Sequence, residues 1–284
     1  MCSHKIQFWV PLINFMTNKE KIEIGDKFVI EKPTPFEKEL VFEQLIKRFE
    51  IIISSEYLLR TYIKVNKSAE KIYEFFDKAI IEFEKAMILF RLFKKEFIGF
   101  NFIVEPLANT STYGYSAVNL SYLIIDRKIE KEKYVIDNGE IELLKKYFRE
   151  YDIFSTSKFD LAVSYFNRSY SQHFLTNIFL DTMIVLENLF LRNTNQELKY
   201  KLSMRMAYVL GGNDKEKREE IFNFIKESYD IRSKIVHGGE IQELDEQRVF
   251  QLRELTKDSL KIFFKERDLY LGKNLDEIIL KGKL

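Results

Sequence analysis

Residues 229–239 read Tyr-Asp-Ile-Arg-Ser-Lys-Ile-Val-His-Gly-Gly, and they stand where a long amphipathic helix should end. The preceding residues, 218–229, carry apolar side chains at three- and four-residue spacings, a pattern that predicts a helix with one buried face. The pair Gly238-Gly239 supplies the residue type that closes helices in a left-handed conformation. His237 is therefore expected in the last turn, where unpaired carbonyls and the negative end of the helix dipole favour a cation.

Arg232 and His237 together are suited to phosphodiester chemistry. An imidazole can exchange protons with an attacking or leaving oxygen, and a guanidinium can hold the charge that builds on phosphate oxygens in the transition state. If the attacking group is the neighbouring 2′-hydroxyl, no metal is needed and the substrate is RNA. On a straight helix these two side chains point ~140° apart. They would converge only if the helix unwinds at His237, or if two copies of the helix meet across a symmetric dimer.

A structural interpretation of the same residues is also open. In it, His237 satisfies backbone carbonyls at the end of the helix, and Arg232 forms a surface ion pair with a carboxylate such as Asp230. Glu187 lies among apolar residues and needs a partner if it is buried. Either Arg232 or Arg205 could be that partner.

Three separated blocks of the sequence resemble the Apea-like branch of the HEPN superfamily. The blocks are residues 186–190, 197–205 and 229–238, and they occur in the same order as in that family. The family's motif is an arginine, four to six intervening residues and a histidine, and Arg232 and His237 fit its four-residue version. The resemblance covers about residues 157–270. It implies a small helical bundle and metal-independent ribonuclease activity.

The resemblance also implies roles for individual residues and for partners. Arg232 and His237 are the expected catalytic residues of an endoribonuclease that leaves a 2′,3′-cyclic phosphate and needs no cofactor. The expected supporting or RNA-contacting residues are Asp230, Ser233, Lys234, Glu187 and Arg205. The implied partners are RNA, a second copy of the chain bound through the HEPN domain, and an antitoxin or phage-derived trigger. The implied setting is anti-phage defence or a toxin–antitoxin system.

A non-catalytic HEPN module that binds a protein or RNA partner is the alternative. Ser233 follows the arginine at a position where active members often carry Asn, Asp or His. The formal net charge of +1 excludes a strongly basic protein with a long nucleic-acid footprint, although a small RNA site needs only local positive charge.

Length and composition indicate a globular chain of the cytoplasm. With 284 residues and 46% hydrophobic residues, the chain can bury one large core or two modest ones. The single cysteine, Cys2, excludes a disulfide framework and fits a reducing compartment. No apolar run approaches the ~18 residues that a membrane span requires.

The sequence predicts an α+β fold that is mainly helical, in two domains. Residues 1–152 mix strands with helices and form a candidate sensor or regulatory domain. Residues 153–284 form the HEPN-type helical bundle. The first domain has no phosphate-binding loop, dinucleotide fingerprint or metal-ligand cluster.

Individual elements of the first domain follow from alternation, helical period and turn residues. They are a strand or packing arm at 8–13, a hairpin at 22–30, a helix from Ser68 to about 93, strands at 97–104, 115–125 and 134–136, and a helix at 139–151. Pro106 is expected to end the strand at 97–104, and residues 36–62 fit either helix or strand. The aromatic stripe of the 68–93 helix is expected to be core. Residues 109–114 form a polar loop, which more often is a plain connection than a ligand site.

The second domain is predicted to contain helices at 159–165, 171–191, 196–210 and 245–266, besides the one that ends near His237. An apolar patch at 275–280 suggests a tail that docks on its own domain or on a partner. Phe174 is among the expected core residues of the 171–191 helix. His173, in the same helix, is expected to be a partly buried structural histidine.

Overall fold

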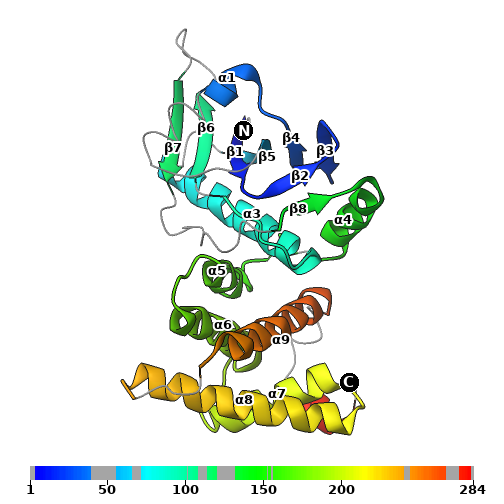
Figure 1. The fold of residues 1–284 in the computed structure, drawn as a ribbon, viewed down its shortest axis with the longest axis vertical. Helices are drawn as coiled ribbons and strands as arrows, with labels where there is room; N and C mark the ends of the chain where they lie inside the picture. The colour runs from blue at the N-terminus through cyan, green and yellow to red at the C-terminus, as the bar shows by residue number, and fades with distance from the viewer. Residues whose placement is uncertain are drawn as a thin grey trace. The chain divides into compact units, whose positions relative to one another are not determined.

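The computed structural model describes residues 4–39, 56–65, 72–100, 102–107, 114–119, 132–151, 153–154, 156–239, 244–266 and 275–282. They belong to two compact units, Met1–Glu150 and Tyr151–Leu284. The sequence predicted this boundary two residues later, between residues 152 and 153. The first unit mixes strands with helices and the second is helical, so the prediction of a mainly helical α+β fold is confirmed (Figure 1).

A six-stranded antiparallel sheet with strand order β3-β4-β5-β1-β6-β7 forms the centre of the described part of the first unit. Its strands are β1 (His4–Leu12), β3 (Lys21–Ile24), β4 (Phe28–Glu31), β5 (Tyr57–Val65), β6 (Phe102–Leu107) and β7 (Gly114–Asn119). β1 pairs with β5 along its whole length, and Phe8, Trp9, Val10 and Leu12 are buried. The predicted strand at 8–13 is therefore an inner strand of the sheet. Two further strands, β2 (Phe15–Thr17) and β8 (Tyr134–Ile136), pair in parallel.

Helix α3 (Ile72–Phe93) supplies the apolar layer that packs against this sheet (Figure 1). The rings of Phe76 and Phe8 of β1 lie edge to face with their centroids 5.3 Å apart, and the ring centroids of Phe83 and Phe28 of β4 lie 6.4 Å apart. The aromatic stripe is buried, as the sequence predicts, because a helix that covers a sheet must bury one face. The helices α1 (Pro35–Lys38) and α4 (Asn138–Glu150) complete the described part of the unit.

Several predicted elements of the first unit are confirmed and one is wrong. The hairpin at 22–30 turns at Gly25, whose φ of +60° suits glycine. The predicted strand at 97–104 is instead β6, which starts at Phe102 and contains Pro106. Among the described residues, β6 pairs with β1 at Trp9–Val104, and no pairing with β1 uses the missing N–H of Pro106. Ser68, residues 40–55, 109–113 and 120–125 lie outside the described residues.

The second unit is built from α5 (Asp160–Ser169), α6 (Leu175–Phe190), α7 (Leu198–Gly211), α8 (Lys215–Val236), α9 (Glu246–Lys265) and α11 (Leu275–Leu280). α6 packs against α5 and α9, and α7 lies along α8 (Figure 1). The rings of Phe190 of α6 and Phe263 of α9 lie edge to face with their centroids 5.0 Å apart, inside a core that also holds Leu186 and Leu252. The apolar patch at 275–280 is α11, which contacts α7, so this tail docks on its own unit.

The start of α6 corrects two predictions. Phe174 is 70% exposed and precedes the helix in an extended conformation, so it is not a core residue. His173 is exposed and lies outside the helix. The reason is local: residues 170–174 form the turn out of α5, where the Ser171 amide donates to the Arg168 carbonyl.

Glu37 gives a pH-dependent test of the first unit. Its carboxylate accepts two hydrogen bonds of 2.8 Å from buried Arg60 of β5, and it completes a capping box with Thr34. Burial would raise the pKa of Glu37, but the hydrogen bonds from Arg60 and Thr34 outweigh it and hold the pKa below its usual value. Because the pKa of Glu37 is lower in the folded state than in the unfolded state, its ionised carboxylate stabilises the fold. This contribution is complete above the unfolded-state pKa of about 4.3 and is lost as pH falls through the folded-state value.

We therefore expect Glu37→Gln to lower the free energy of unfolding by about 1–2 kcal/mol at pH 7. The difference from the parent should narrow once pH falls below about 4. Urea unfolding at a series of pH values measures it, with Glu20→Gln, at an exposed ion pair, as the control. A deficit that stays constant from pH 7 to pH 3 would contradict the assignment.

Candidate functional site

The C-terminal end of α8 is closed by the glycine pair. The Gly239 amide donates to the Lys234 carbonyl at 2.8 Å, and the Gly238 amide donates to the Ile235 carbonyl at 3.3 Å. These are the two bonds of a Schellman motif, and Gly238 has the left-handed φ of +72° that the motif requires. His237 is the C-cap residue, as the sequence predicts, and its side chain is exposed.

The imidazole of His237 does not cap the helix. The carbonyls of Lys234 and Ile235 already accept the two glycine amides, and the Ser233 carbonyl accepts the backbone amide of His237 at 3.1 Å. Within the described residues the His237 ring makes no hydrogen bond or ion pair. The structural interpretation of this side chain is therefore wrong.

Arg232 forms an ion pair with Glu187 of α6. The Nε of Arg232 lies 3.2 Å from Oε1 of Glu187, and its Nη2 lies 3.5 Å from Oε2. Both side chains are mostly covered, with 28% of Arg232 and 22% of Glu187 exposed. Burial raises the pKa of Glu187, although the neighbouring Arg232 acts in the opposite direction. Burial also raises the pKa of Tyr229, whose ring lies 5.9 Å from the Arg232 guanidinium.

Asp230 is not the partner of Arg232. Both carboxylate oxygens of Asp230 accept hydrogen bonds of 2.7 Å from the Lys199 ammonium on α7. The expected surface pair Arg232–Asp230 is therefore wrong. Asp230 lies on the side of α8 that faces α7, whereas Arg232 reaches α6.

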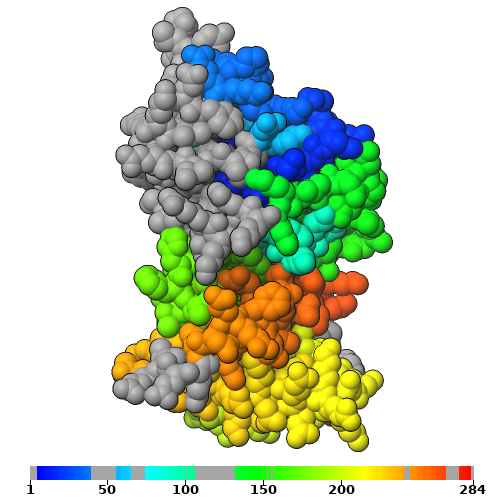
Figure 2. All heavy atoms as spheres, viewed as in Figure 1, coloured from blue at the N-terminus to red at the C-terminus, as the bar shows by residue number. Residues whose placement is uncertain are grey.

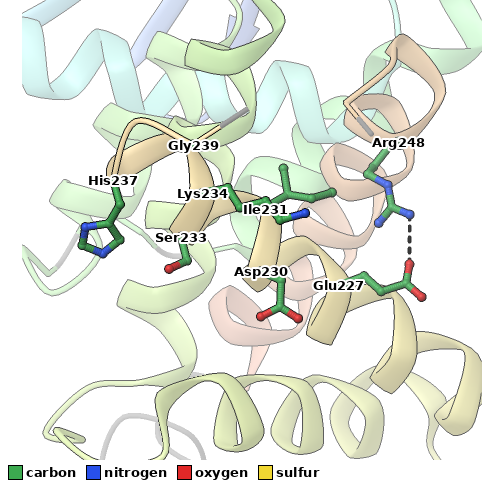
Figure 3. Close-up of a pocket in the computed structure, with 8 residues that line it drawn as sticks. All are labelled: Glu227, Asp230, Ile231, Ser233, Lys234, His237, Gly239 and Arg248. Carbon is green, nitrogen blue, oxygen red and sulfur yellow. Dashed lines mark hydrogen bonds and ion pairs between the residues drawn. The ribbon is translucent and has the colours of Figure 1, made fainter. Parts of the chain in front are cut away.

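An open groove of about 920 Å³ runs along α8 beside His237. Its lining residues are Glu227, Asp230, Ile231, Ser233, Lys234, His237, Gly239 and Arg248 (Figure 3). Arg248, from the start of α9, donates to Glu227 at 3.0 Å and so joins α9 to the wall of the groove. Figure 2 shows α9, in orange, at the surface of this unit beside the yellow residues of α8.

The groove contains four of the seven predicted site residues, but not the complete pair. Asp230, Ser233, Lys234 and His237 line it, whereas Arg232, Glu187 and Arg205 do not. In Figure 3 the His237 ring points away from Asp230 and Glu227, at the far end of the row of lining side chains. One chain therefore does not bring Arg232 and His237 to the same cavity.

Arg205 has a structural position. Only 5% of it is exposed, and it donates to the Phe190 carbonyl at 2.5 Å, to Thr194 at 3.0 Å and to Asp276 at 2.7 and 2.8 Å. The hydrogen bond from Arg205 lowers the pKa of Asp276. Arg205 thus ties the end of α6 to α11, and it is not the partner of Glu187.

Sequence reasoning missed Lys199, Glu227 and Arg248 as parts of this surface. Glu227 had a usable signal, because it shares a helix face with Lys234 at a spacing of two turns. Lys199 and Arg248 had none, because their positions depend on how α7 and α9 pack against α8.

No protein-family model matches this chain, and no curated protein or solved structure is significantly similar to it. Within the residues that the structure describes, no helix combines the length and apolarity needed to cross a membrane. The same part of the chain holds no cluster of three or more His, Cys, Asp or Glu side chains arranged as metal ligands.

Arg205→Ala tests the structural assignment of this residue. It should lower the free energy of unfolding by about 3 kcal/mol, because the change leaves buried acceptors without a donor. Urea unfolding at pH 7 measures the loss. Lys199→Ala is the matched control: it breaks an exposed ion pair and should cost at most about 1 kcal/mol. Equal costs for the two variants would contradict the assignment.

Proposed function

We propose that this chain is a metal-independent endoribonuclease of the HEPN type, with Arg232 and His237 as its catalytic residues. The observation that carries the proposal is the exposed imidazole of His237 on an open groove, at a helix end whose carbonyls are satisfied by other groups. Lys234 and Arg248 place cations in the same groove, in which Arg248 is paired with Glu227. An exposed imidazole beside cations is suited to proton transfer on a phosphodiester.

The reaction is a transesterification within RNA. The 2′-hydroxyl oxygen attacks the adjacent phosphorus and gives up its proton, while the bond to the 5′-oxygen breaks and that oxygen takes up a proton. The products are a 2′,3′-cyclic phosphate and a 5′-hydroxyl end. His237 serves as the proton acceptor or donor, and Arg232 stabilises the negative charge on the phosphorane oxygens.

Glu187 acts as a positioning residue for Arg232. A guanidinium has five N–H donors in a planar fork. The Nε and Nη2 atoms of Arg232 face Glu187, which leaves donors of the same plane for a phosphate. A carboxylate that holds one edge of the guanidinium also reduces the side-chain freedom that would be lost on binding RNA.

A second copy of the chain completes the site in this proposal. Arg232 reaches α6 and His237 lines the groove, so the two residues of one chain are on different faces of α8. A twofold axis beside α8, which would pack α8 against α8 of a second copy, is the arrangement in which Arg232 of each chain would meet the groove of its partner, as closed symmetric dimers place one patch against itself.

The biological setting follows from the resemblance. RNA cleavage would serve anti-phage defence or a toxin, and the first unit would sense a phage-derived trigger or bind an antitoxin. The mixed fold of that unit, separate from the helical unit that holds the groove, supports a division between sensing and cutting.

A non-catalytic module that binds RNA or protein is the second candidate. The observation that favours it is the engagement of Arg232 by Glu187, away from the groove of His237. Ser233 in the motif is also compatible with it. The cleavage measurements below separate the two candidates.

Purified protein should cleave single-stranded or transfer RNA in the presence of a chelator. His237→Ala should lower the rate at least about 100-fold, the usual contribution of a general acid or base. Arg232→Lys should lower it by a similar factor, because a point charge cannot hold Glu187 and a phosphate in one plane. Gel electrophoresis measures the cleavage rate, and mapping of the product ends identifies the 2′,3′-cyclic phosphate. His173→Ala, at the other exposed histidine of this unit, is the matched control, and cutting by His237→Ala at the parent rate would eliminate the enzyme proposal.

Mixing two inactive variants tests the dimer. A dimer of one Arg232→Ala chain and one His237→Ala chain retains one intact arginine and one intact histidine in opposite chains. Cleavage should therefore reappear on mixing after subunit exchange, at about a quarter of the parent rate, because about half of the dimers are mixed and each mixed dimer has one of its two sites intact. If the mixture stays as inactive as its components while size-exclusion chromatography shows exchanged dimers, the two residues do not cooperate between chains.

A further inference from the structure

We infer that α7 and α8 form a nucleobase pocket next to the groove of His237, which would make unpaired RNA the substrate class of the proposed nuclease. The pocket is a cavity of about 610 Å³, within the range of ligand sites of about 300–1,000 Å³. Its lining residues are Glu197, Leu198, Lys199, Tyr200, Phe222, Lys226 and Tyr229. The inference rests on the proposed function, because it assigns a second contact to the same RNA.

Three aromatic side chains give the pocket its chemistry. Tyr200 of α7 and Phe222 of α8 meet edge to face, with ring centroids 5.9 Å apart and planes at 75°. Tyr229 lies two turns along α8 on the same face as Phe222. Tyr200 is 56% exposed, so a ring face is open to solvent at the mouth of the pocket. Exposed aromatic faces on a pocket wall are the surfaces on which unstacked bases bind.

Two lysines add the charge that a nucleotide requires. Lys226 is exposed on α8 and, within the described residues, forms no ion pair. Lys199 carries the exposed ion pair with Asp230, which is weak because water and salt screen both charges. Glu197 has the opposite charge, but its carboxylate lies 3.8 Å from the Lys201 ammonium. Aromatic faces with flanking cations fit a base and its phosphate better than the apolar surface of a protein partner.

The pocket and the groove are neighbours on α8. The Lys199–Asp230 pair stands between them, because Lys199 lines the pocket and Asp230 lines the groove. Phe222, Lys226, Tyr229 and Ser233 follow each other at three- and four-residue spacings, which places them on one stripe of the helix. A strand could therefore place one base in the pocket and a nearby phosphate at His237. A base in a duplex is stacked and cannot enter, so the substrate must be unpaired there.

Binding of an uncleavable oligonucleotide tests the pocket without relying on catalysis. The probe is a fluorescein-labelled single-stranded 2′-O-methyl RNA, titrated with the full chain in chelator and followed by anisotropy. Tyr200→Ala should weaken binding about tenfold, the effect of losing one base stack, whereas Tyr200→Phe should stay within about twofold of the parent. Lys226→Gln should make the slope of log affinity against log salt concentration shallower by about 0.7, the value expected for the loss of one phosphate contact on a single strand.

Two matched comparisons make the result specific. Phe174→Ala removes another exposed aromatic ring, which lies outside the pocket, and should bind as the parent does. An abasic oligonucleotide has no base to stack, so Tyr200→Ala should bind it as the parent does. Equal weakening on both oligonucleotides, parent-like binding by Tyr200→Ala, no binding by the parent, or a changed oligomeric state in Tyr200→Ala would each overturn the inference. Weaker base-dependent binding by Tyr200→Ala in a chain that cuts no RNA would retain the pocket and remove only the nuclease.

Discussion

The hydrogen bonds that close α8 determine how its basic residues can be used. Gly238 and Gly239 donate to the carbonyls that a C-cap side chain would otherwise satisfy, and they keep the helix regular as far as Val236. The imidazole of His237 is thereby left at an exposed helix end without a structural partner among the described residues. The ring lines the groove, where a ligand can reach it.

The same regularity keeps Arg232 and His237 apart. The helix ends at His237, its C-cap residue, yet Arg232 still reaches Glu187 of α6 while His237 lines the groove. The end of the helix therefore does not bring the two side chains together within one chain. Arg232 is further held by Glu187, whose partial burial makes the loss of this cation costly. The shared site that we propose therefore depends on a second copy, whose α8 would supply the missing partner.

The sequence predicted the secondary structure of this region better than its pairings. Helical period and glycine placement located the end of α8, because both are local properties of the chain. The partners of Arg232, Asp230 and Arg205 depend on how α6, α7 and α11 pack, and no spacing within one helix contains that information. The 97–104 strand was misplaced for a similar reason: whether Pro106 ends a strand depends on which neighbour needs its N–H. Local patterns thus identified the candidate residues, whereas tertiary packing decided which of them share a cavity.

The two ion pairs on α8 differ in a way that bears on RNA binding. Lys199 and Asp230 are exposed to 37% and 52%, so water and salt already screen their attraction, and a phosphate can replace the carboxylate at little cost. Arg232 and Glu187 are more covered, and separating them would leave a partly buried carboxylate without its cation. Lys199 is therefore a cation that can change partners, whereas in the proposed nuclease Arg232 would bind a phosphate while still held by Glu187. In the proposed dimer, the exchangeable cation of one chain would admit a strand, and the fixed cation of the other chain would orient its phosphate.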